Sequence, residues 1–290
     1  MKAAREDRLD SDAGKGGFPT KHLLLVAAII AVATVLWRSI EEQSAEVALE
    51  QPAVVEAVIA EPPPLPPAED IPPPPPKPVA ETDSPDEEIV EVEVALPDLA
   101  DSDAMVREQL SAAGIGPELD RLEQQQNLIQ QGTALIDGFS RGLVLRKLLP
   151  VAPPTEIFSV EQRGDQMFMA PASYERYNGH AEAFATLDTK LLVANFHTMR
   201  PLYEQAYGQL GLNPEDFDNA VIRMLDRILA TPEIEEPIAL TRRSVMYQYA
   251  DPELEQLPPI QKQLLRMGPK NIRIIKEQAR ALRSGLLNLE

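Results

Sequence analysis

Proline is distributed unevenly in this chain of 290 residues, and its distribution limits where a folded domain can lie. Half of the 28 prolines fall between Pro52 and Pro97, in runs such as EPPPLPPAEDIPPPPPKP. Proline fixes φ near about −65° and lacks a backbone N–H donor, so the stretch favours polyproline II over helix or sheet. The sequence therefore predicts a disordered Pro-rich linker over 41–104 and one folded domain over 105–290.

Acidic residues are concentrated in the same linker. Residues 41–104 carry eighteen Asp and Glu against one Lys, out of a net charge of −19 for the whole chain. The folded domain is therefore only mildly acidic, and neither part has the basic surface that nucleic-acid binding requires. We expect no nucleic-acid partner. Cysteine is absent, which excludes disulfides, thiolate nucleophiles and zinc sites built on cysteine.

An apolar, uncharged run precedes the linker. Residues 23–37 read LLLVAAIIAVATVLW, and the wider segment 22–40 approaches the ~20 residues that a helix needs to cross a bilayer. Residues 1–21 contain five Lys and Arg, which predicts a cytoplasmic N-terminal segment and a domain on the far side of the membrane. A cleavable signal peptide is the alternative, but the Trp37-Arg38 pair stands where small residues should precede cleavage. The sequence therefore predicts a transmembrane helix at 22–40.

Helical periodicity dominates 105–290, and we predict a mainly α fold with a small β-hairpin. Apolar spacing predicts a helix over 118–139, and Pro201 should kink or end a later one. Asn213-Pro214 is a typical helix start, and Gly268-Pro269 separates the last two helices. Two β-prone runs flank Arg163-Gly164-Asp165, which we interpret as the turn of the hairpin and not as an adhesion motif.

One part of the linker has strand-like alternation. The segment EIVEVEVAL, 88–96, alternates valine and isoleucine with glutamate, which suits addition to the edge of a sheet. A disordered acidic segment is the alternative interpretation.

Candidate binding residues fall into two groups. All six tyrosines lie in three short segments, and tyrosine serves both recognition surfaces and buried hydrogen-bond networks. The C-terminal helices carry a basic stripe, which could be a solvated face, a site for an anionic ligand or lipid headgroup, or a docking face for the chain's own acidic linker. The candidate residues are Tyr174, Arg176, Tyr177, Tyr203, Tyr207, Asp251, Glu255, Lys262, Arg266, Arg273, Lys276, Arg280 and Arg283.

Several motifs resemble one family in the order in which they occur. The chain is similar to the DUF3014 family over nearly all of 98–288, with two departures, at 135–142 (LIDGFSRG) and at Ser173, where Asn is usual. The resemblance implies a membrane-anchored proteobacterial envelope protein, and hence a bacterial inner membrane location with a periplasmic domain, and it supplies no activity. The motifs are LADSDAMVREQL, SYERY, RPLYEQAYGQLG, LATPEIEEPIAL, YQYADPELE and QKQLLRMGP.

No catalytic signature is present in the domain. His180 and His197 are its only histidines, they form no HExxH pattern, and GxSxG, P-loop and GxGxxG motifs are absent. We expect no enzyme activity, no cofactor and no metal. The favoured function is an interaction or scaffolding module on a stalk, with an envelope protein, peptidoglycan or an anionic ligand as its partner. An envelope hydrolase acting on a glycan or peptide, and a TonB-like energy transducer, are the alternatives.

Overall fold

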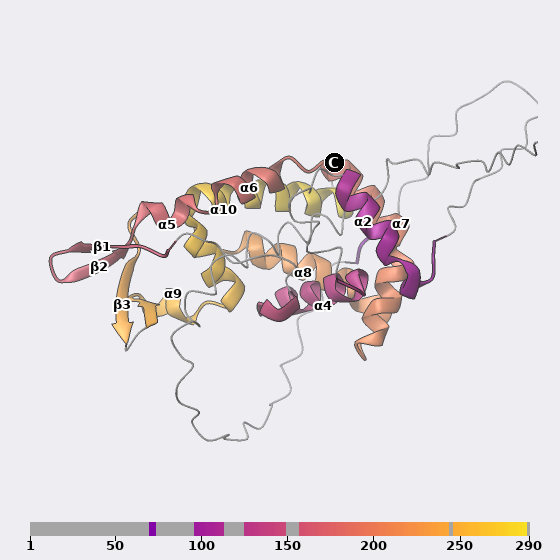
Figure 1. The fold of residues 1–290 in the computed structure, drawn as a ribbon, viewed down its shortest axis with the longest axis horizontal. Coiled ribbons are helices and arrows are strands. Elements are labelled where there is room, and N and C mark those ends of the chain that lie inside the picture. Colours follow the sequence, from indigo (N-terminus) through magenta and orange to yellow (C-terminus); the bar gives the residue numbers. More distant parts are fainter. Residues whose placement is uncertain (1–69, 74–95, 113–124, 149–156, 244–245, 289–290) are drawn as a thin grey trace, which may run out of the picture.

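The computed structural model describes residues 70–73, 96–112, 125–148, 157–243 and 246–288. The expected transmembrane helix at 22–40 lies outside these ranges, as does nearly all of the strand-like segment 88–96. Within the described ranges, none of the helices has both the length and the apolar character that a bilayer crossing requires. The described strands form one four-stranded sheet, and Figure 1 shows this sheet at one end of the molecule.

The folded part starts with a short 3-10 helix, η2 (Leu99–Asp101), followed by α2 (Asp103–Ala112). Leu99 is only 3% exposed and belongs to the main core. The packed structure therefore includes residues that precede the expected boundary at 105.

The next helix, α4 (Leu128–Ser140), is shorter than the helix predicted over 118–139. Residues 125–127 are not helical, so the prediction is wrong there, and 118–124 lie outside the described residues. Asn127 has a left-handed backbone with φ 60°, which cannot continue a helix. The Asp103 carboxylate accepts hydrogen bonds of 2.8 Å from the backbone N–H groups of Asn127 and Leu128, so a residue of another helix caps this N-terminus.

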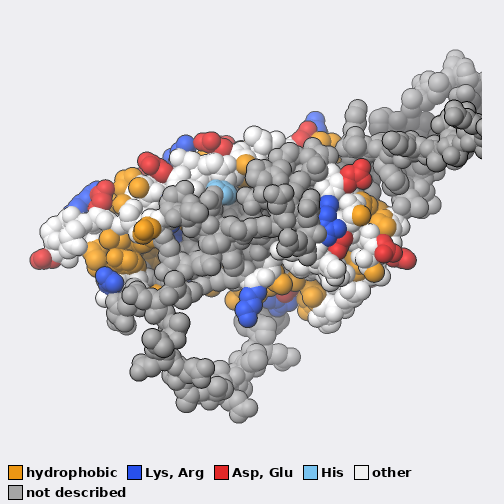
Figure 2. All heavy atoms as spheres, viewed as in Figure 1, with side chains coloured by type: hydrophobic (Ala, Val, Ile, Leu, Met, Phe, Trp, Pro, Cys, Tyr) orange, Lys and Arg blue, Asp and Glu red, His pale blue; other side chains and the backbone are white. Residues whose placement is uncertain are grey.

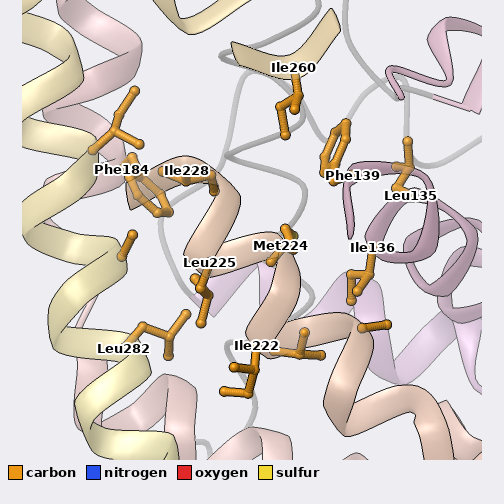
Figure 3. Packing of buried hydrophobic residues seen from close by; sticks show 14 of the residues in the cluster. Leu135, Ile136, Phe139, Phe184, Ile222, Met224, Leu225, Ile228, Ile260 and Leu282 are labelled. Atoms are coloured by element: carbon orange, nitrogen blue, oxygen red, sulfur yellow. The ribbon is translucent and has the colours of Figure 1, made fainter. Parts of the chain in front are cut away.

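Helix α8 (Phe217–Leu229) lies at the centre of the core. The short helix η4 (Pro214–Asp216) precedes it, as the Asn213-Pro214 start predicts. Figure 3 shows α4 side chains on one flank of α8, and on the other flank Phe184 of α6 (Asn178–Ala185) and Leu282 of α10 (Pro259–Leu286). Because α8 is covered on two sides, its apolar residues pack in both directions and hold the helical layers together.

The described part of the chain between α4 and α8 includes the helices α5 (Pro171–Glu175), α6 (Asn178–Ala185) and α7 (Thr189–Gln209). The Asp188 carboxylate caps α7 by accepting from the N–H groups of Lys190 and Leu191. Pro201 does not end the helix, which continues to Gln209. A proline removes one helical hydrogen bond, and burial of the following turns offsets that loss.

The sheet is larger than the predicted hairpin. Strands β1 (Val160–Arg163) and β2 (Gln166–Met169) form that hairpin, with Gly164 at φ 61° in its turn. A second hairpin, β3 (Ala239–Arg243) and β4 (Met246–Tyr249), was not predicted. Pairing of Met167 with Leu240 joins the two hairpins into one antiparallel sheet in the order β1-β2-β3-β4.

The chain closes with α9 (Pro252–Gln256) and α10 (Pro259–Leu286); the 3-10 turn η3 (Arg146–Leu148) follows α4. The predicted break at Gly268-Pro269 is confirmed, because Gly268 has a non-helical φ of 80° inside α10. The apolar stripe of α10 is buried as predicted and packs against α6, α7 and α8. Its members are Ile272, Ile275, Ala279, Leu282 and Leu286.

Candidate functional site

The candidate residues Asp251, Glu255 and Lys262 lie where β4, α9 and α10 come together. Glu255 accepts the backbone N–H of Tyr249 and the Lys262 ammonium, each at 2.9 Å. The phenol of Tyr249 donates to the carbonyl oxygen of Lys262, also at 2.9 Å. Burial alone would raise the pKa of Glu255. The hydrogen bonds from Lys262 and from the Tyr249 N–H, together with the charge of nearby Arg266, outweigh burial and lower that pKa. Asp251 accepts from the N–H of Glu253 and so caps α9.

The segments around Tyr174 and Gly268 lie far apart in the sequence but pack tightly against each other. A Cβ atom built on Gly268 would lie 2.6 Å from the Tyr174 ring, so only glycine fits under the ring. Asn271 donates to the carbonyl oxygen of Tyr174 at 3.1 Å. Tyr177 is fully buried, and the Arg176 guanidinium lies over its ring and over Phe158. Tyr177 is therefore enclosed by the domain, while Tyr174 packs on Gly268 and remains partly exposed.

The second tyrosine segment belongs to the core. Tyr203 and Tyr207 pack with Phe196 and Phe217 in an aromatic cluster. The Tyr207 hydroxyl donates to Asp137 Oδ1 at 2.9 Å across a separation of 70 residues. Burial raises the pKa of both phenols, so both remain donors.

The basic stripe of α10 is largely paired with carboxylates of the same domain. Lys276 lies 2.8 Å from Glu233, Arg283 lies 2.7 Å from Asp226, Lys270 lies 3.5 Å from Glu182 and Arg273 pairs with Glu235. Arg280 is exposed and lies close enough to Glu233 to help lower the pKa of that carboxyl, an effect in which the Lys276 hydrogen bond is the largest cause. Figure 2 shows basic and acidic side chains interspersed on the visible face.

A further polar cluster was missed by the sequence analysis and lies between α7 and α8. Arg200 reaches Asp218 Oδ2 at 2.5 Å and Glu204 at 2.8 Å. Burial raises the pKa of Asp218 to about 6, and the charges of Glu204 and Asp70 add to this, although Arg200 and the backbone N–H of Ile71 oppose it. His197, one helical turn before Arg200, has its pKa lowered by burial and by the Arg200 charge.

The cluster brings a residue of the linker into the domain. Ile71 is only 3% exposed and joins the main apolar core, while Asp70 and Pro73 are exposed. The spacing of His197, Arg200 and Glu204 by three and four residues could have shown a shared polar face on α7. Nothing in the sequence connects that face to Ile71, since the contact is long-range.

Comparison with known protein families places most of the folded domain in a family. A family model described as "Protein of unknown function (DUF3014)" matches residues 128–283, which is more than half of the chain. The chain belongs to the DUF3014 family. No curated protein and no solved structure matches it.

The DUF3014 region contains all three tyrosine segments and the basic stripe. It begins with the first residue of α4 and includes the contact between Tyr174 and Gly268 as well as the Arg200 and Asp218 pair. Ile71 lies outside this region. Among the described residues, no group of three or more His, Asp or Glu side chains is arranged to hold a metal ion.

Proposed function

We propose that this DUF3014 protein is a single-pass inner-membrane protein that presents a helical interaction domain in the periplasm on a Pro-rich stalk. The observation that carries the proposal is the order of three segments in one chain. A run of fifteen uncharged residues at 23–37 follows a basic segment, an acidic Pro-rich linker comes next, and a packed helical domain completes the chain. This order suits a domain that meets a partner at a distance from the membrane.

Pairing of the α10 cations favours a protein as the partner. A small anion, a lipid headgroup or a peptidoglycan carboxylate would have to compete with Glu233 and Asp226, which are fixed beside Lys276 and Arg283. Docking of the acidic residues 81–103 onto this stripe would face the same competition. A protein surface can instead supply charges of both signs and match the alternation of the domain.

Compartment reporters test the membrane placement. Alkaline phosphatase, which is active only outside the cytoplasm, should be active when fused after Glu290 and inactive when fused within 1–15. A cytoplasmic reporter at the same two positions should give the opposite pattern. Phosphatase activity at the N-terminal fusion alone, or at neither position despite stable expression, would contradict the proposed topology.

A further inference from the structure

Ile71 lies within the predicted linker, but its side chain packs into the core of the domain. The next described residues begin at 96, yet Ile71 is buried in the same core cluster as Leu99 and Val106. Pro72 is half-buried and Pro73 is exposed, so the segment enters the core with one apolar side chain and leaves it again at once. This is how a short extended peptide binds a receptor through a single anchor residue.

A buried ion pair lies at the same point. The Asp218 side chain is 3% exposed and lies 2.5 Å from Arg200, and it is close enough to Asp70 and Ile71 for both residues to affect its pKa. The segment therefore meets charged side chains of α7 and α8 where the core receives the isoleucine. Prolines at the next two positions favour the extended conformation in advance, which reduces the entropy lost on docking.

We propose that the α7–α8 face at Arg200 and Asp218 is a peptide-binding site for an extended segment in which an aliphatic residue precedes two prolines, and that residues 70–73 of the same molecule occupy it. The inference concerns the domain and its linker, and it stands apart from the membrane placement. Residues 74–95 join the docked segment to the domain, so the local concentration of the ligand is on the order of millimolar. Docking holds residues 70–73 against the domain.

The same site would accept a partner that carries a similar segment. Such a partner must displace the tethered ligand, so its apparent affinity is reduced by the fraction of sites that the linker occupies. Displacement releases residues 70–73 from the domain. The site is thereby a binding surface whose own linker regulates access.

Spin labels test the docked state in the full-length chain, which has no native cysteine. Labels at Asp70→Cys and Gln205→Cys, both exposed positions, should give one narrow, short distance distribution in electron paramagnetic resonance. Ile71→Asp should broaden and lengthen it, and the milder Ile71→Ala should do so in part. Leu65→Asp is the matched control, since Leu65-Pro66-Pro67 has the same order of residues, and it should leave the distribution unchanged. A broad distribution in the unaltered background, or an equal effect of Leu65→Asp, would overturn the assignment.

Mixing chains that carry single labels distinguishes occupancy within one molecule from exchange between two copies. The mixture should give no short distance. A short distance there would show that a second copy supplies the segment, and would overturn occupancy within the same molecule.

A fluorescent peptide of residues 68–75 tests binding directly. The full-length Ile71→Asp chain, checked for an unchanged helical circular dichroism spectrum, should bind the peptide at least about tenfold more tightly than the unaltered chain, because its tethered competitor is disabled. If that chain loses its helical spectrum, the Ile71→Ala chain takes its place with the same expected direction. A peptide with aspartate in place of isoleucine should not bind either chain. Equal affinity for both chains, or no binding to the vacated site, would refute the proposal.

Discussion

Replacing Gly268 by alanine should destabilise the domain strongly, for two separable reasons. Gly268 has φ 80° and ψ 162°, a region that residues with a Cβ atom avoid at a cost of about 1 to 3 kcal/mol. The new methyl group would also lie 2.6 Å from the Tyr174 ring, where overpacking costs about 1 to 3 kcal/mol more. We expect a total near 4 kcal/mol in urea unfolding, and a melting temperature lower by roughly 10 °C in a domain of this size.

Gly211→Ala is the matched control for the backbone cost. Gly211 also has φ 80°, but a Cβ atom there would meet nothing within 4 Å, so this variant should lose about 1 to 2 kcal/mol. Adding Tyr174→Ala to Gly268→Ala should remove the overlap, and the double variant should be more stable than the sum of the single effects by at least about 1 kcal/mol. Equal losses for the two glycine variants, together with additive behaviour of the pair, would refute the proposed packing of the ring on Gly268.

Two further predictions concern buried hydroxyl and carboxyl groups. Tyr207→Phe should lower the free energy of unfolding in urea by about 1 to 2 kcal/mol, because it removes a hydrogen-bond donor to the Asp137 carboxylate. Tyr203→Phe should cost less, because the Tyr203 hydroxyl lies 3.4 Å from Asn195. A larger loss for Tyr203→Phe than for Tyr207→Phe would contradict these hydrogen bonds. The pKa of Asp218 is raised in the folded state to about 6 from 3.8, so its neutral form favours folding and that stabilisation is lost as the pH rises through 6. Relative to Asp218→Asn, the unaltered chain should therefore gain about 1 kcal/mol between pH 7 and pH 5, and an identical pH dependence of the two would contradict burial of this carboxyl.

Local signals in the sequence account for the elements that were predicted correctly. The break in α10 follows from Gly268-Pro269, where glycine permits a left-handed φ and proline cannot continue a helix from within. The buried stripe of α10 follows from spacings of three and four. The β1–β2 hairpin follows from Gly164 between two β-prone runs, since a two-residue turn fixes the register of its strands.

The remaining features depend on contacts between distant segments. Strand β3 contains Thr241, Arg242 and Arg243 and lacks a clear alternation, and its place in the sheet is set by pairing with β2. Asp103 starts α2 but caps α4, which no local capping pattern could indicate. Composition places Ile71 within the predicted linker 41–104, and its burial depends on long-range packing that composition does not show.

The sequence predicted which residue types to examine, but it did not predict how they are arranged. The tyrosines and cations of the short segments do make specific contacts in the structure. They lie in three places: an aromatic cluster in the core, the hydrogen bonds around Glu255, and ion pairs on the surface. Charge pairing along α10 was not predictable, because Glu233 and Asp226 approach Lys276 and Arg283 only after the helices pack. The cluster at Asp218 joins three segments, and its charge state depends on burial that composition does not show.

The central claim is that the DUF3014 domain stands across a membrane from the N-terminus, and cysteine accessibility in intact cells tests it most directly. The chain has no native cysteine, so single cysteines at exposed Glu253 and at Asp10 report one side each. A maleimide that cannot cross the inner membrane should label Glu253→Cys in cells with a permeabilised outer membrane, and should label Asp10→Cys only after lysis. Labelling of Asp10→Cys in intact cells, or protection of Glu253→Cys until lysis, would contradict the account.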